Sequence, residues 1–514
     1  MSQINSSQSD GDERYSALIN NAAAVRAICS AVEGTLGPKG LDTMLVSELG
    51  DVLITNDGAT ILEQMDVTHP AAKLVVQVAR SQQRHVGDGT TTATVLAGAM
   101  VAEGLSEVSR GVPVAKVVAG IQEGIGQAVQ FMRSRSRPVL GADDPMLYRI
   151  AYVAGRENRE LADQIIEAMN IVGQETLGSE QFRFSESVIT ADGGSSEVWP
   201  GILLNKQPSM FLPVKDLLSA KILVLQDALE PEQMEEEALT TEMGYKAYSE
   251  RKEKFLQQLE QLSALNVGLI AVDRGAHAEA EQFCADRGIL LLTRVPRNDL
   301  LKLSRYTGAR PLRRSGLNKS PEDLVASLGF AGQIRYDERI QKVKVGEGAG
   351  QPAVTIVVGG TTKEVVSERA RIAKDAASAV QAAIRSGYVA GGGAIEIAAA
   401  RELDRYGETV RGMEGFGISA VARALRKPMA QIVTNAGFNP LEKVEQVKAV
   451  QLESDTDSIA VDCDTGQLMD CFKSEVVDPT YVKIQAIQAA GEVASAVLRI
   501  HTVVKMKKGY SADE

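Results

Sequence analysis

The sequence predicts a multidomain protein in which helical flanks surround a central α/β region. The chain has 514 residues, enough for about three domains. Before residue 137 and after residue 394 the apolar residues recur at helical spacing, whereas from Gly201 to about Val358 short aliphatic runs alternate with helical stretches. Such alternation is typical of strands and helices packed in layers. The fold class is therefore α and α/β in one chain.

In the first flank, residues from about Tyr15 to Ser136 read as long helices broken by turns. The segment Ala71–Arg84 has an apolar stripe, and Val46–Ile54 is short and rich in aliphatic residues, which favours a hairpin. The polar, acidic start Met1–Glu13 is predicted to be a disordered arm and has no signal-peptide pattern. Helices are then expected at Val114–Met132, Leu147–Tyr152 and Asn158–Ile171.

The central region should contain four strands separated by helices such as Ala276–Arg287 and Asn298–Thr307. A charged stretch from Glu230 to Ser249 interrupts it, and the helix after this stretch carries Phe255, Leu256, Leu259, Leu262 and Leu265, which we assign to one face. The glycines at Gly346–Gly350 lead into Gln-Pro and are interpreted as a loop. The expected strands are Lys221–Leu225, Val267–Val272, Gly288–Leu292 and Val354–Val358.

The last part of the chain is again mostly helical. Thr362–Arg385 has apolar residues at helical spacing, and Gly387 is placed to end that helix. Helices should continue from Ala394 to the C-terminus, apart from a turn-rich stretch at Asp455–Gly466.

Three glycine-containing turns in the first flank suggest a phosphate site. They are Thr35–Gly40, Asn56–Gly58 and Gly87–Thr92. Asp supplies hard oxygen ligands to Mg²⁺, and the threonines from Thr90 stand where a helix begins, whose free N–H groups attract phosphate. Taken singly, each turn is explained equally well by ordinary turn and capping chemistry.

Composition excludes several classes of protein. Charged residues make up 24% and hydrophobic residues 44%, as in a globular protein, and the net charge of −12 argues against nucleic acid as the main partner. The four cysteines are scattered without a CxxC pair, which fits a reducing, cytoplasmic environment. No apolar run approaches the roughly 20 residues of a membrane span. Walker A, HExxH and GxSxG motifs are absent.

The three turns together resemble the nucleotide-site signature of the chaperonins, the ring-forming ATP-driven folding machines. The resemblance continues at Ser367–Asp375, Gly387–Gly393 and Val477–Thr480, in the family's order and over nearly the whole chain. It implies an equatorial ATP domain from both ends of the chain, an intermediate hinge domain from two connecting segments, and an apical substrate domain from the centre. The implied segments are 1–137 and 393–514 (equatorial), 138–198 and 359–392 (intermediate), and 199–358 (apical).

The resemblance also implies roles for individual residues, with ATP and Mg²⁺ as cofactors. Asp88 would ligate Mg²⁺, Asp57 would assist catalysis near the γ-phosphate, and Asp375 would orient and polarise the attacking water. From local sequence alone Asp375 lies off the apolar stripe of its helix and would be an exposed surface residue. The implied nucleotide-binding residues are Thr35, Leu36, Gly37, Pro38, Gly89, Thr90, Thr91, Thr92, Gly392, Asp462, Cys463 and Asp478. Lys39 is left outside the catalytic set.

The thermosome type of chaperonin, or the bacterial group III branch, is the better match. The charged stretch at about 230–255 matches the helical protrusion that closes such rings as a built-in lid, so no separate lid protein is expected. The C-terminus also lacks a Gly-Gly-Met repeat. The implied partners are non-native polypeptides and identical or homologous subunits in a double ring, with no nucleic acid and no membrane.

One departure and two alternatives accompany this interpretation. Thermosome-like sequences often carry a phosphate-sensing Lys where this chain has Arg156, and Arg differs from Lys in shape and hydration. The first alternative is a nucleotide-binding regulatory or scaffold protein on a chaperonin fold without turnover. The second is a small-molecule phosphotransferase with an unrelated ATP site, which would form small oligomers rather than large rings.

Overall fold

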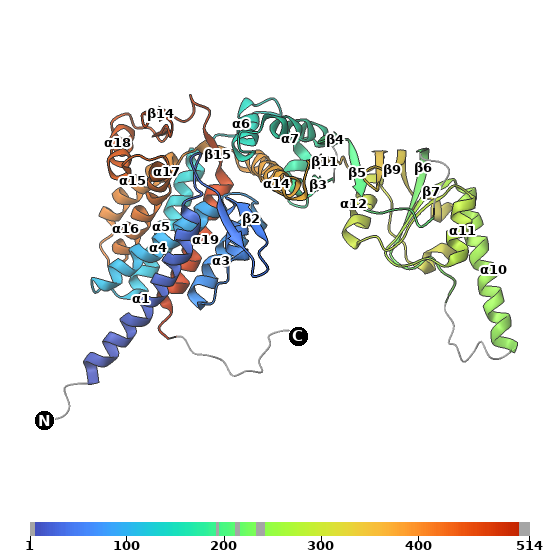
Figure 1. Ribbon diagram of the computed structural model, residues 1–514, viewed down its shortest axis with the longest axis horizontal. Helices are drawn as coiled ribbons and strands as arrows, with labels where there is room; N and C mark the ends of the chain where they lie inside the picture. Colours follow the sequence, from blue (N-terminus) through green and yellow to red (C-terminus); the bar gives the residue numbers. More distant parts are fainter. Residues whose placement is uncertain (1–5, 192–194, 211–215, 233–241, 503–514) are drawn as a thin grey trace. The chain divides into compact units, whose positions relative to one another are not determined.

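The structure, a computed structural model, contains two compact units. Unit 1 is formed by residues 1–163, 183–185 and 371–514, and unit 2 by residues 164–182 and 186–370. Both ends of the chain therefore belong to unit 1, although about 200 residues separate its two main segments. The backbone is described for residues 6–191, 195–210, 216–232 and 242–502 (Figure 1).

Unit 1 is built from long helices that pack side by side around one apolar core. α4 (Thr90–Ser109) lies against α19 (Thr480–Arg499), and α5 (Val114–Arg135) lies against α16 (Glu414–Leu425). The contacting residues are mostly Ala, Val, Ile and Leu, whose burial drives the packing. The remaining helices of this unit are α1 (Ser6–Glu33), α2 (Gly58–Gln64), α3 (Pro70–His85), α6 (Pro145–Ala154), α15 (Ala394–Thr409), α17 (Lys427–Asn435) and α18 (Pro440–Glu453).

Three two-stranded sheets complete unit 1. The first is a hairpin of β1 (Thr43–Val46) and β2 (Val52–Thr55), which confirms the hairpin predicted there. The second pairs β12 (Tyr388–Ala390) with β15 (Val477–Pro479), and the third pairs β13 (Ile459–Val461) with β14 (Leu468–Asp470). The second sheet joins segments almost 90 residues apart and so brings Asp478 opposite Val389.

Unit 2 contains a six-stranded mixed sheet in the order β5-β10-β9-β6-β7-β8. β6, β7 and β8 are parallel, and the other neighbours are antiparallel. Along β6, Ile222 and Val224 enter one apolar cluster while Leu223 and Leu225 enter another, as the alternation of a strand covered on both faces requires. The strands are β5 (Gly201–Leu204), β6 (Asp216–Leu225), β7 (Val267–Val272), β8 (Leu290–Leu292), β9 (Gly329–Asp337) and β10 (Lys342–Gly348).

Helices and a second, smaller sheet surround this sheet. The smaller sheet has the order β3-β11-β4, with β3 (Val188–Thr190), β4 (Glu197–Trp199) and β11 (Thr355–Val358). α7 (Arg159–Val172) and α14 (Lys363–Ser386) each contribute residues to both units. The helical segments within unit 2 are α8 (Gln174–Gly178), α10 (Glu242–Ala264), α11 (Ala278–Asp286), α12 (Arg297–Thr307), α13 (Pro321–Val325) and the 3₁₀ turn η2 (Arg314–Asn318). A further 3₁₀ turn, η1 (Phe184–Ser187), follows α8.

The structure corrects three sequence-based predictions. Ser6–Glu13 of the predicted disordered arm belong to helix α1, because extending an existing helix costs far less than starting one. Gly346 and Gly348 lie inside strand β10 rather than in a loop, and the β9–β10 hairpin was missed altogether. Leu256 is 36% exposed, since it follows Phe255 by one position and faces away from the buried stripe. The strand predicted at Val354–Val358 is confirmed as β11 (Thr355–Val358), which belongs to the three-stranded sheet.

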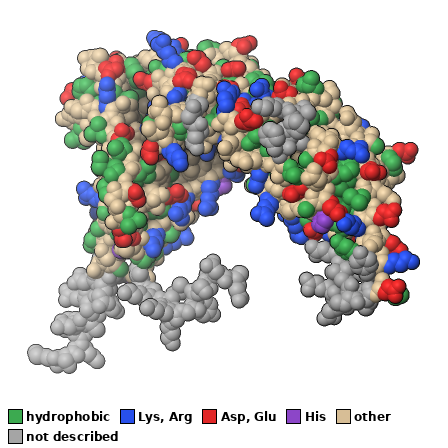
Figure 2. Space-filling view, turned by 45° about the vertical axis from the view of Figure 1, so that its right-hand side comes forward, with side chains coloured by type: hydrophobic (Ala, Val, Ile, Leu, Met, Phe, Trp, Pro, Cys, Tyr) green, Lys and Arg blue, Asp and Glu red, His purple; other side chains and the backbone are tan. Residues whose placement is uncertain are grey.

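The helix stop predicted at Gly387 agrees with the structure. α14 ends at Ser386, and Gly387 adopts a positive φ of 73° there, as predicted for a helix stop. In the face shown in Figure 2, acidic and basic side chains are interspersed. Within the described ranges no helix has the length and apolarity required to cross a membrane.

Candidate nucleotide site

The three glycine-containing turns of the first flank lie together in unit 1. The hydroxyl oxygens of Thr35 and Thr91 are 3.5 Å apart, and Thr90 donates a hydrogen bond of 3.4 Å to the Oδ1 atom of Asp57. Thr35, Asp57 and Thr90 come from three separate turns, so the tertiary structure unites segments that sequence spacing alone left apart. Their convergence makes a shared ligand the simplest explanation for all three.

Asp57 has a structural task as well as its predicted one. It is the N-cap of α2, and its Oδ2 atom accepts from the backbone N–H of Thr60 at 2.8 Å and from the Thr60 hydroxyl at 2.6 Å. Its Oδ1 atom faces Thr90 and lies 3.6 Å from Nη1 of Arg371. One carboxylate oxygen thus holds the helix start, and the other faces the predicted site.

The loop before α4 is shaped by two glycines with positive φ. Gly87 has φ of 78° and Gly89 has φ of 75°, a region that side chains disfavour. A Cβ on Gly87 would lie 2.3 Å from the hydroxyl of Ser378 in α14, and one on Gly89 would lie 2.7 Å from Val482 in α19. The loop can therefore pack tightly between these helices, and it places Thr90 at the N-terminus of α4.

Asp88 lies between these two glycines. Its Oδ1 atom accepts a hydrogen bond of 2.6 Å from the backbone N–H of Gly89. Burial and the nearby carboxylate of Asp478 raise the pKa of Asp88 to about 6. A carboxylate that is costly to ionise in the free protein gains from a cation, because the cation restores the balance of charge.

Asp375 faces the same site, so the surface position expected from local sequence is wrong. It lies on α14, its side chain is only 17% exposed, and its Oδ2 atom accepts from Nη1 of Arg371 at 2.8 Å. Burial raises the pKa of Asp375 well above its ordinary value, although the Arg371 guanidinium opposes the rise. The carboxylates of Asp57 and Asp88 add to it. A carboxylate with a raised pKa is a stronger base near neutral pH.

The glycine turn after β12 and strand β15 form a second part of the site. Gly391 stands next to Asp478, since a Cβ on that glycine would lie 3.2 Å from the Oδ2 atom of Asp478. Gly392 has φ of 60°, and a Cβ there would lie 3.4 Å from Ala460 in β13. Gly392 and Asp478 are therefore close together, as expected of two residues predicted to contact one nucleotide.

Buried polar groups join this part to the Asp88 loop. The Nε2 atom of Gln82 donates to the backbone carbonyl of Asp88 at 2.8 Å and to that of Val482 at 3.2 Å. The field of Asp478 raises the pKa of Asp88, which also places the two carboxylates near each other. Seven of the predicted residues thus lie around one region: Thr35, Asp57, Asp88, Thr90, Thr91, Asp375 and Asp478.

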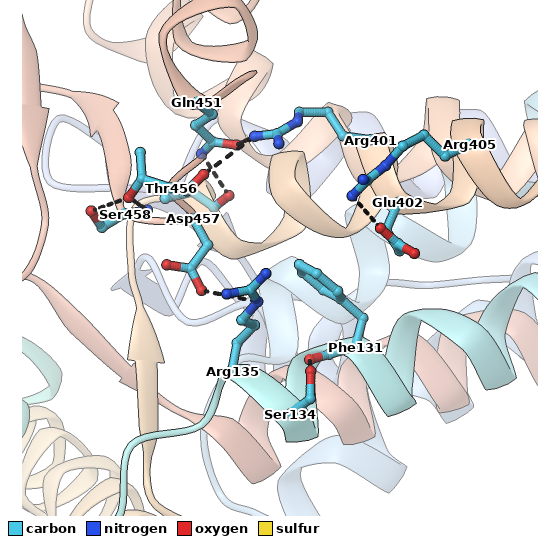
Figure 3. A network of polar contacts seen from close by, with 11 residues as sticks. Phe131, Ser134, Arg135, Arg401, Glu402, Arg405, Gln451, Thr456, Asp457 and Ser458 are labelled. Atoms are coloured by element: carbon cyan, nitrogen blue, oxygen red, sulfur yellow. Dashed lines mark hydrogen bonds and ion pairs between the residues drawn. The ribbon is translucent and has the colours of Figure 1, made fainter. Parts of the chain in front are cut away.

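A polar network joins the start of α15, which follows the glycine turn, to strand β13. The Nε2 atom of Gln451 donates at 3.1 Å to the carbonyls of both Ala394 and Ile459, and its Oε1 atom accepts from Arg401 at 3.3 Å. Arg401 also donates to the carbonyl of Thr456 (Figure 3). Gln451 is fully buried, so this network fixes the spacing between the glycine turn and β13.

Asp462 and Cys463, predicted near the base, belong to the turn between β13 and β14. The Oδ1 atom of Asp462 accepts from the backbone N–H groups of Asp464 and Thr465, and these bonds lower its pKa. The turn also contacts the first loop, because Asp464 forms a 2.5 Å ion pair with Lys39. The structure therefore gives Asp462 a role in shaping the turn, and its contact with a base stays a prediction.

Two further predicted regions have recognisable constraints. The loop with Leu36, Gly37 and Pro38 is anchored by Asn435, whose Nδ2 atom donates to the carbonyls of Glu33 and Leu36 at 2.9 Å.

Arg156 and its neighbour Glu157 both have positive φ, 54° and 59°, which is unfavourable for residues with side chains. Burial raises the pKa of Asp375, and the charge of Arg156 opposes this rise, so the arginine is near the acidic site.

The residues present fit a magnesium–nucleotide ligand. Carboxylate and hydroxyl oxygens are the ligands Mg²⁺ prefers, and the start of α4 offers backbone N–H groups to phosphate. Within the described residues, the buried Oε1 atom of Gln82 and the buried Oδ1 atom of Asn56 have no hydrogen-bond partner. Unsatisfied buried acceptors are uncommon, and here they adjoin Asp88 and Asp57.

Sequence reasoning left two charged residues of this region without a role. Arg371 lies inside the Ser367–Asp375 motif and bridges the two predicted catalytic carboxylates, as its contacts above show. Lys483 lies five residues after Asp478 and forms a buried ion pair with it. For Lys483, its closeness in sequence to Asp478 was a hint of a contact, but only the fold showed that the two side chains meet.

Fold and site together define the chain as a chaperonin: it belongs to the TCP-1/cpn60 chaperonin family, whose model matches residues 28–508. A thermosome subunit of Pyrococcus abyssi is 34% identical, covering 97% of this chain and 93% of the relative. The thermosome subunit beta of Aeropyrum pernix is 35% identical, covering 95% and 91%. The crystal structure of a group III chaperonin in the open state is 40% identical, has a TM-score of 0.85, and matches 96% of this chain and 100% of its own.

These similarities confirm the predicted family, fold class and general function. The chain is an ATP-dependent chaperonin, and ATP hydrolysis belongs to its function. An unrelated phosphotransferase is excluded, because the match covers nearly the whole chain. The general prediction of subunits assembling and binding unfolded clients is confirmed at the family level.

Proposed function

We propose that the site in unit 1 hydrolyses ATP with Asp88 on the metal side and Asp375 on the side of the attacking water. Asp88 would hold Mg²⁺, which supplies charge neutralisation at the phosphate oxygens. Thr90, Thr91 and the start of α4 would bind phosphate, and Gly392 and Asp478 the nucleoside. The raised pKa of Asp375, described above, carries this proposal, because it suits a residue that takes a proton from water.

Arg371 and Asp57 complete the proposed mechanism. Arg371 donates to the Oδ2 atom of Asp375 and so would fix the direction of the carboxylate before water attacks the γ-phosphate. Asp57 contributes its Oδ1 atom while its Oδ2 atom caps α2. Single-turnover hydrolysis together with ATP titration tests the assignment: Asp88→Ala should weaken magnesium–nucleotide binding, whereas Asp375→Ala should slow hydrolysis with ATP still bound.

We infer further that copies of this chain, or homologous chains, assemble into a double ring through unit 1. The β1–β2 hairpin supports this, since it is a two-stranded sheet with open edges and large exposed apolar side chains. Met44 is 61% exposed and its cross-strand partner Ile54 is 53% exposed. Replacing both with Lys should produce smaller particles in light scattering and incomplete rings in negative-stain images.

The lid is proposed to be formed by the charged stretch at about 230–255. Residues 233–241 lie outside the described part of the chain, so the evidence comes from α10. Its first residues are exposed, with Met243 84% exposed, and Figure 1 shows this end of α10 extending beyond the six-stranded sheet. Its second half is anchored by Phe255, Leu259 and Leu262, each at most 2% exposed.

Deleting residues 231–249 tests the lid. The deletion should leave folding and ATP hydrolysis largely intact, because the removed stretch is rich in charged and polar residues. A bound client should then lose its protection from protease in the presence of ATP. A client that stays protected would contradict the lid assignment.

The three-domain division given above and a cytoplasmic location are proposed on the same family basis.

A further inference from the structure

Lys483 is a buried cation at the nucleoside side of the site. It lies in the first turn of α19, its side chain is 9% exposed, and its Nζ atom is 2.8 Å from the Oδ2 atom of Asp478 and 2.8 Å from the Oε1 atom of Glu396. Burial by itself would lower the pKa of Lys483, but the two carboxylates outweigh it and raise that pKa. Lys483 therefore carries a positive charge that is shared between two acidic residues.

The two carboxylates differ in what they face. Glu396 is in the first turn of α15, just after the glycine turn, and its side chain is 1% exposed. Asp478 is in β15 and is 29% exposed, so part of it is open to a ligand. Lys483 thus connects a wholly internal acid to one at the edge of the site.

The ion pair occupies one oxygen of Asp478 and leaves the other available. The Oδ2 atom contacts Lys483, and a Cβ on Gly391 would lie 3.2 Å from the same atom. Across the segments that the structure describes, the Oδ1 atom has no hydrogen bond or ion pair. A carboxylate held through one oxygen presents the other oxygen in a defined direction. A ligand hydroxyl can then donate to that oxygen at a lower entropic cost.

We propose that Lys483 is a positioning residue that makes the site selective for the ribose hydroxyls of the nucleotide. It does so by holding Asp478 through Oδ2, so that Oδ1 accepts a hydrogen bond from a ribose hydroxyl. This inference rests on the proposed function, because it requires the nucleoside to bind beside Asp478. Lys483 pairs with Glu396 and with Asp478 on the nucleoside side of the proposed site, so its removal should affect nucleotide affinity and sugar selectivity more than turnover.

The variants must separate this role from simple stability. Lys483→Met alone would strand Glu396 as a buried unpaired charge, a costly arrangement. The double variant Lys483→Met with Glu396→Gln removes that charge and keeps the shapes similar. Glu396→Gln alone is the matched control, since it alters the same buried cluster but keeps the bond from Lys483 to Asp478. Asp478→Asn and Lys483→Arg complete the set.

The experiment measures the affinity of each full-length variant for ATP, 2′-deoxy-ATP and 3′-deoxy-ATP by calorimetry, and its hydrolysis rate at saturating ATP. We expect the unaltered protein to prefer ATP over at least one deoxy form by about tenfold, the value of one charge-assisted hydrogen bond. The double variant should bind ATP about tenfold more weakly and lose the preference, with a saturated rate within about threefold of the unaltered rate. Glu396→Gln should keep the preference, and Lys483→Arg should retain part of it.

The possible failures can be told apart. If the folded double variant keeps the sugar preference, or if Glu396→Gln loses it equally, Lys483 is only structural and the inference is wrong. The inference also fails if the unaltered protein binds all three nucleotides equally. If the unaltered protein binds no ATP at all, the proposed function itself fails, which is a different result.

Discussion

Buried carboxylates occur in both units, but their surroundings shift the carboxylate pKa in opposite directions. In unit 1, the charges of Asp57 and Asp88 act on Asp375, and burial raises the pKa of both Asp88 and Asp375 above the ordinary value. In unit 2, burial also opposes ionisation of Asp337, but hydrogen bonds from Arg339 and the charge of Lys344 outweigh it and lower its pKa.

The physical difference is the supply of cations. Lys344 lies 3.4 Å from Asp337 and 2.6 Å from Glu197, and its ammonium group is 5.1 Å from the ring centre of Trp199. In unit 1, Asp57 and Asp375 share the single guanidinium of Arg371, so their negative charges exceed the positive charge beside them. The cluster in unit 2 is complete without a ligand, whereas the cluster in unit 1 gains stability when a cation arrives. The raised pKa values of Asp88 and Asp375 thus accompany the predicted nucleotide site, whereas the lowered pKa of Asp337 accompanies a structural ion pair.

The largest effect is expected from Asp375→Ala. Removing a general base or water-orienting group typically costs about 10²–10⁴ in rate, which corresponds to about 3–5 kcal/mol of barrier. Single-turnover hydrolysis should fall by that amount while ATP titration still shows binding. An unchanged rate would show that Asp375 does not act on the attacking water. Asp337→Ala is the matched control and should leave the bound-state rate nearly unaffected.

Lys344→Met should destabilise unit 2. The substitution leaves Asp337 and Glu197 without their shared cation, and breaking such a pair costs about 2–4 kcal/mol after allowing for the exposure of Glu197. Trp199 is the only tryptophan in the sequence and lies beside Lys344, so its fluorescence reports the change. Urea unfolding followed by this signal should show an earlier transition. A midpoint equal to that of the unaltered protein would show that the cluster is not stabilising.

Asp88→Asn and Asp337→Asn should change stability in opposite directions. The pKa of Asp88 is about 6 in the folded protein and 3.8 when unperturbed, so the folded state binds more protons between these values. Stability of the free protein therefore falls as the pH rises from about 4 to 6, and Asp88→Asn should recover about 1–2 kcal/mol at pH 8 and almost nothing at pH 4.

The pKa of Asp337 is lowered, so its contribution is present above the unperturbed value of 3.8 and is lost as the pH falls below it. Asp337→Asn should consequently destabilise the protein at pH 7 and have little effect in acid. Urea unfolding monitored by circular dichroism, without nucleotide or Mg²⁺, measures both variants. If both substitutions changed the unfolding free energy in the same direction at pH 8, the proposed difference between the two clusters would be wrong.

The smallest effect is expected from Lys39→Ala. Its ion pair with Asp464 joins two loops at the site, but the side chains of Lys39 and Asp464 are 48% and 75% exposed, and such pairs contribute little. Thermal unfolding should be unchanged, and the hydrolysis rate should stay within about twofold of the unaltered rate. A larger loss of rate would place Lys39 among the phosphate ligands, from which it was left out.

The sequence determined the family, the helical flanks and the α/β centre, and it predicted a set of candidate site residues, seven of which the fold brings around one region. These follow from local information: apolar spacing, glycine at turns, and short motifs such as Gly87–Thr92 that keep their order along the chain. It failed where the outcome depended on distant partners. The β9–β10 hairpin was missed because it contains polar residues and glycines, and the start of α1 was misjudged because a helix can extend through polar sequence.

Only the tertiary structure decided which charged residues act together. Local periodicity places Asp375 off the apolar stripe of α14, yet its side chain is largely buried and pairs with Arg371, which also lies beside Asp57. The same holds for Lys483, whose two carboxylate partners come from α15 and β15, and for Lys344 in unit 2. The reason is physical: a pattern along the chain fixes the direction of a side chain from its own helix or strand, but ionisation and ion pairing depend on what other segments bring against it.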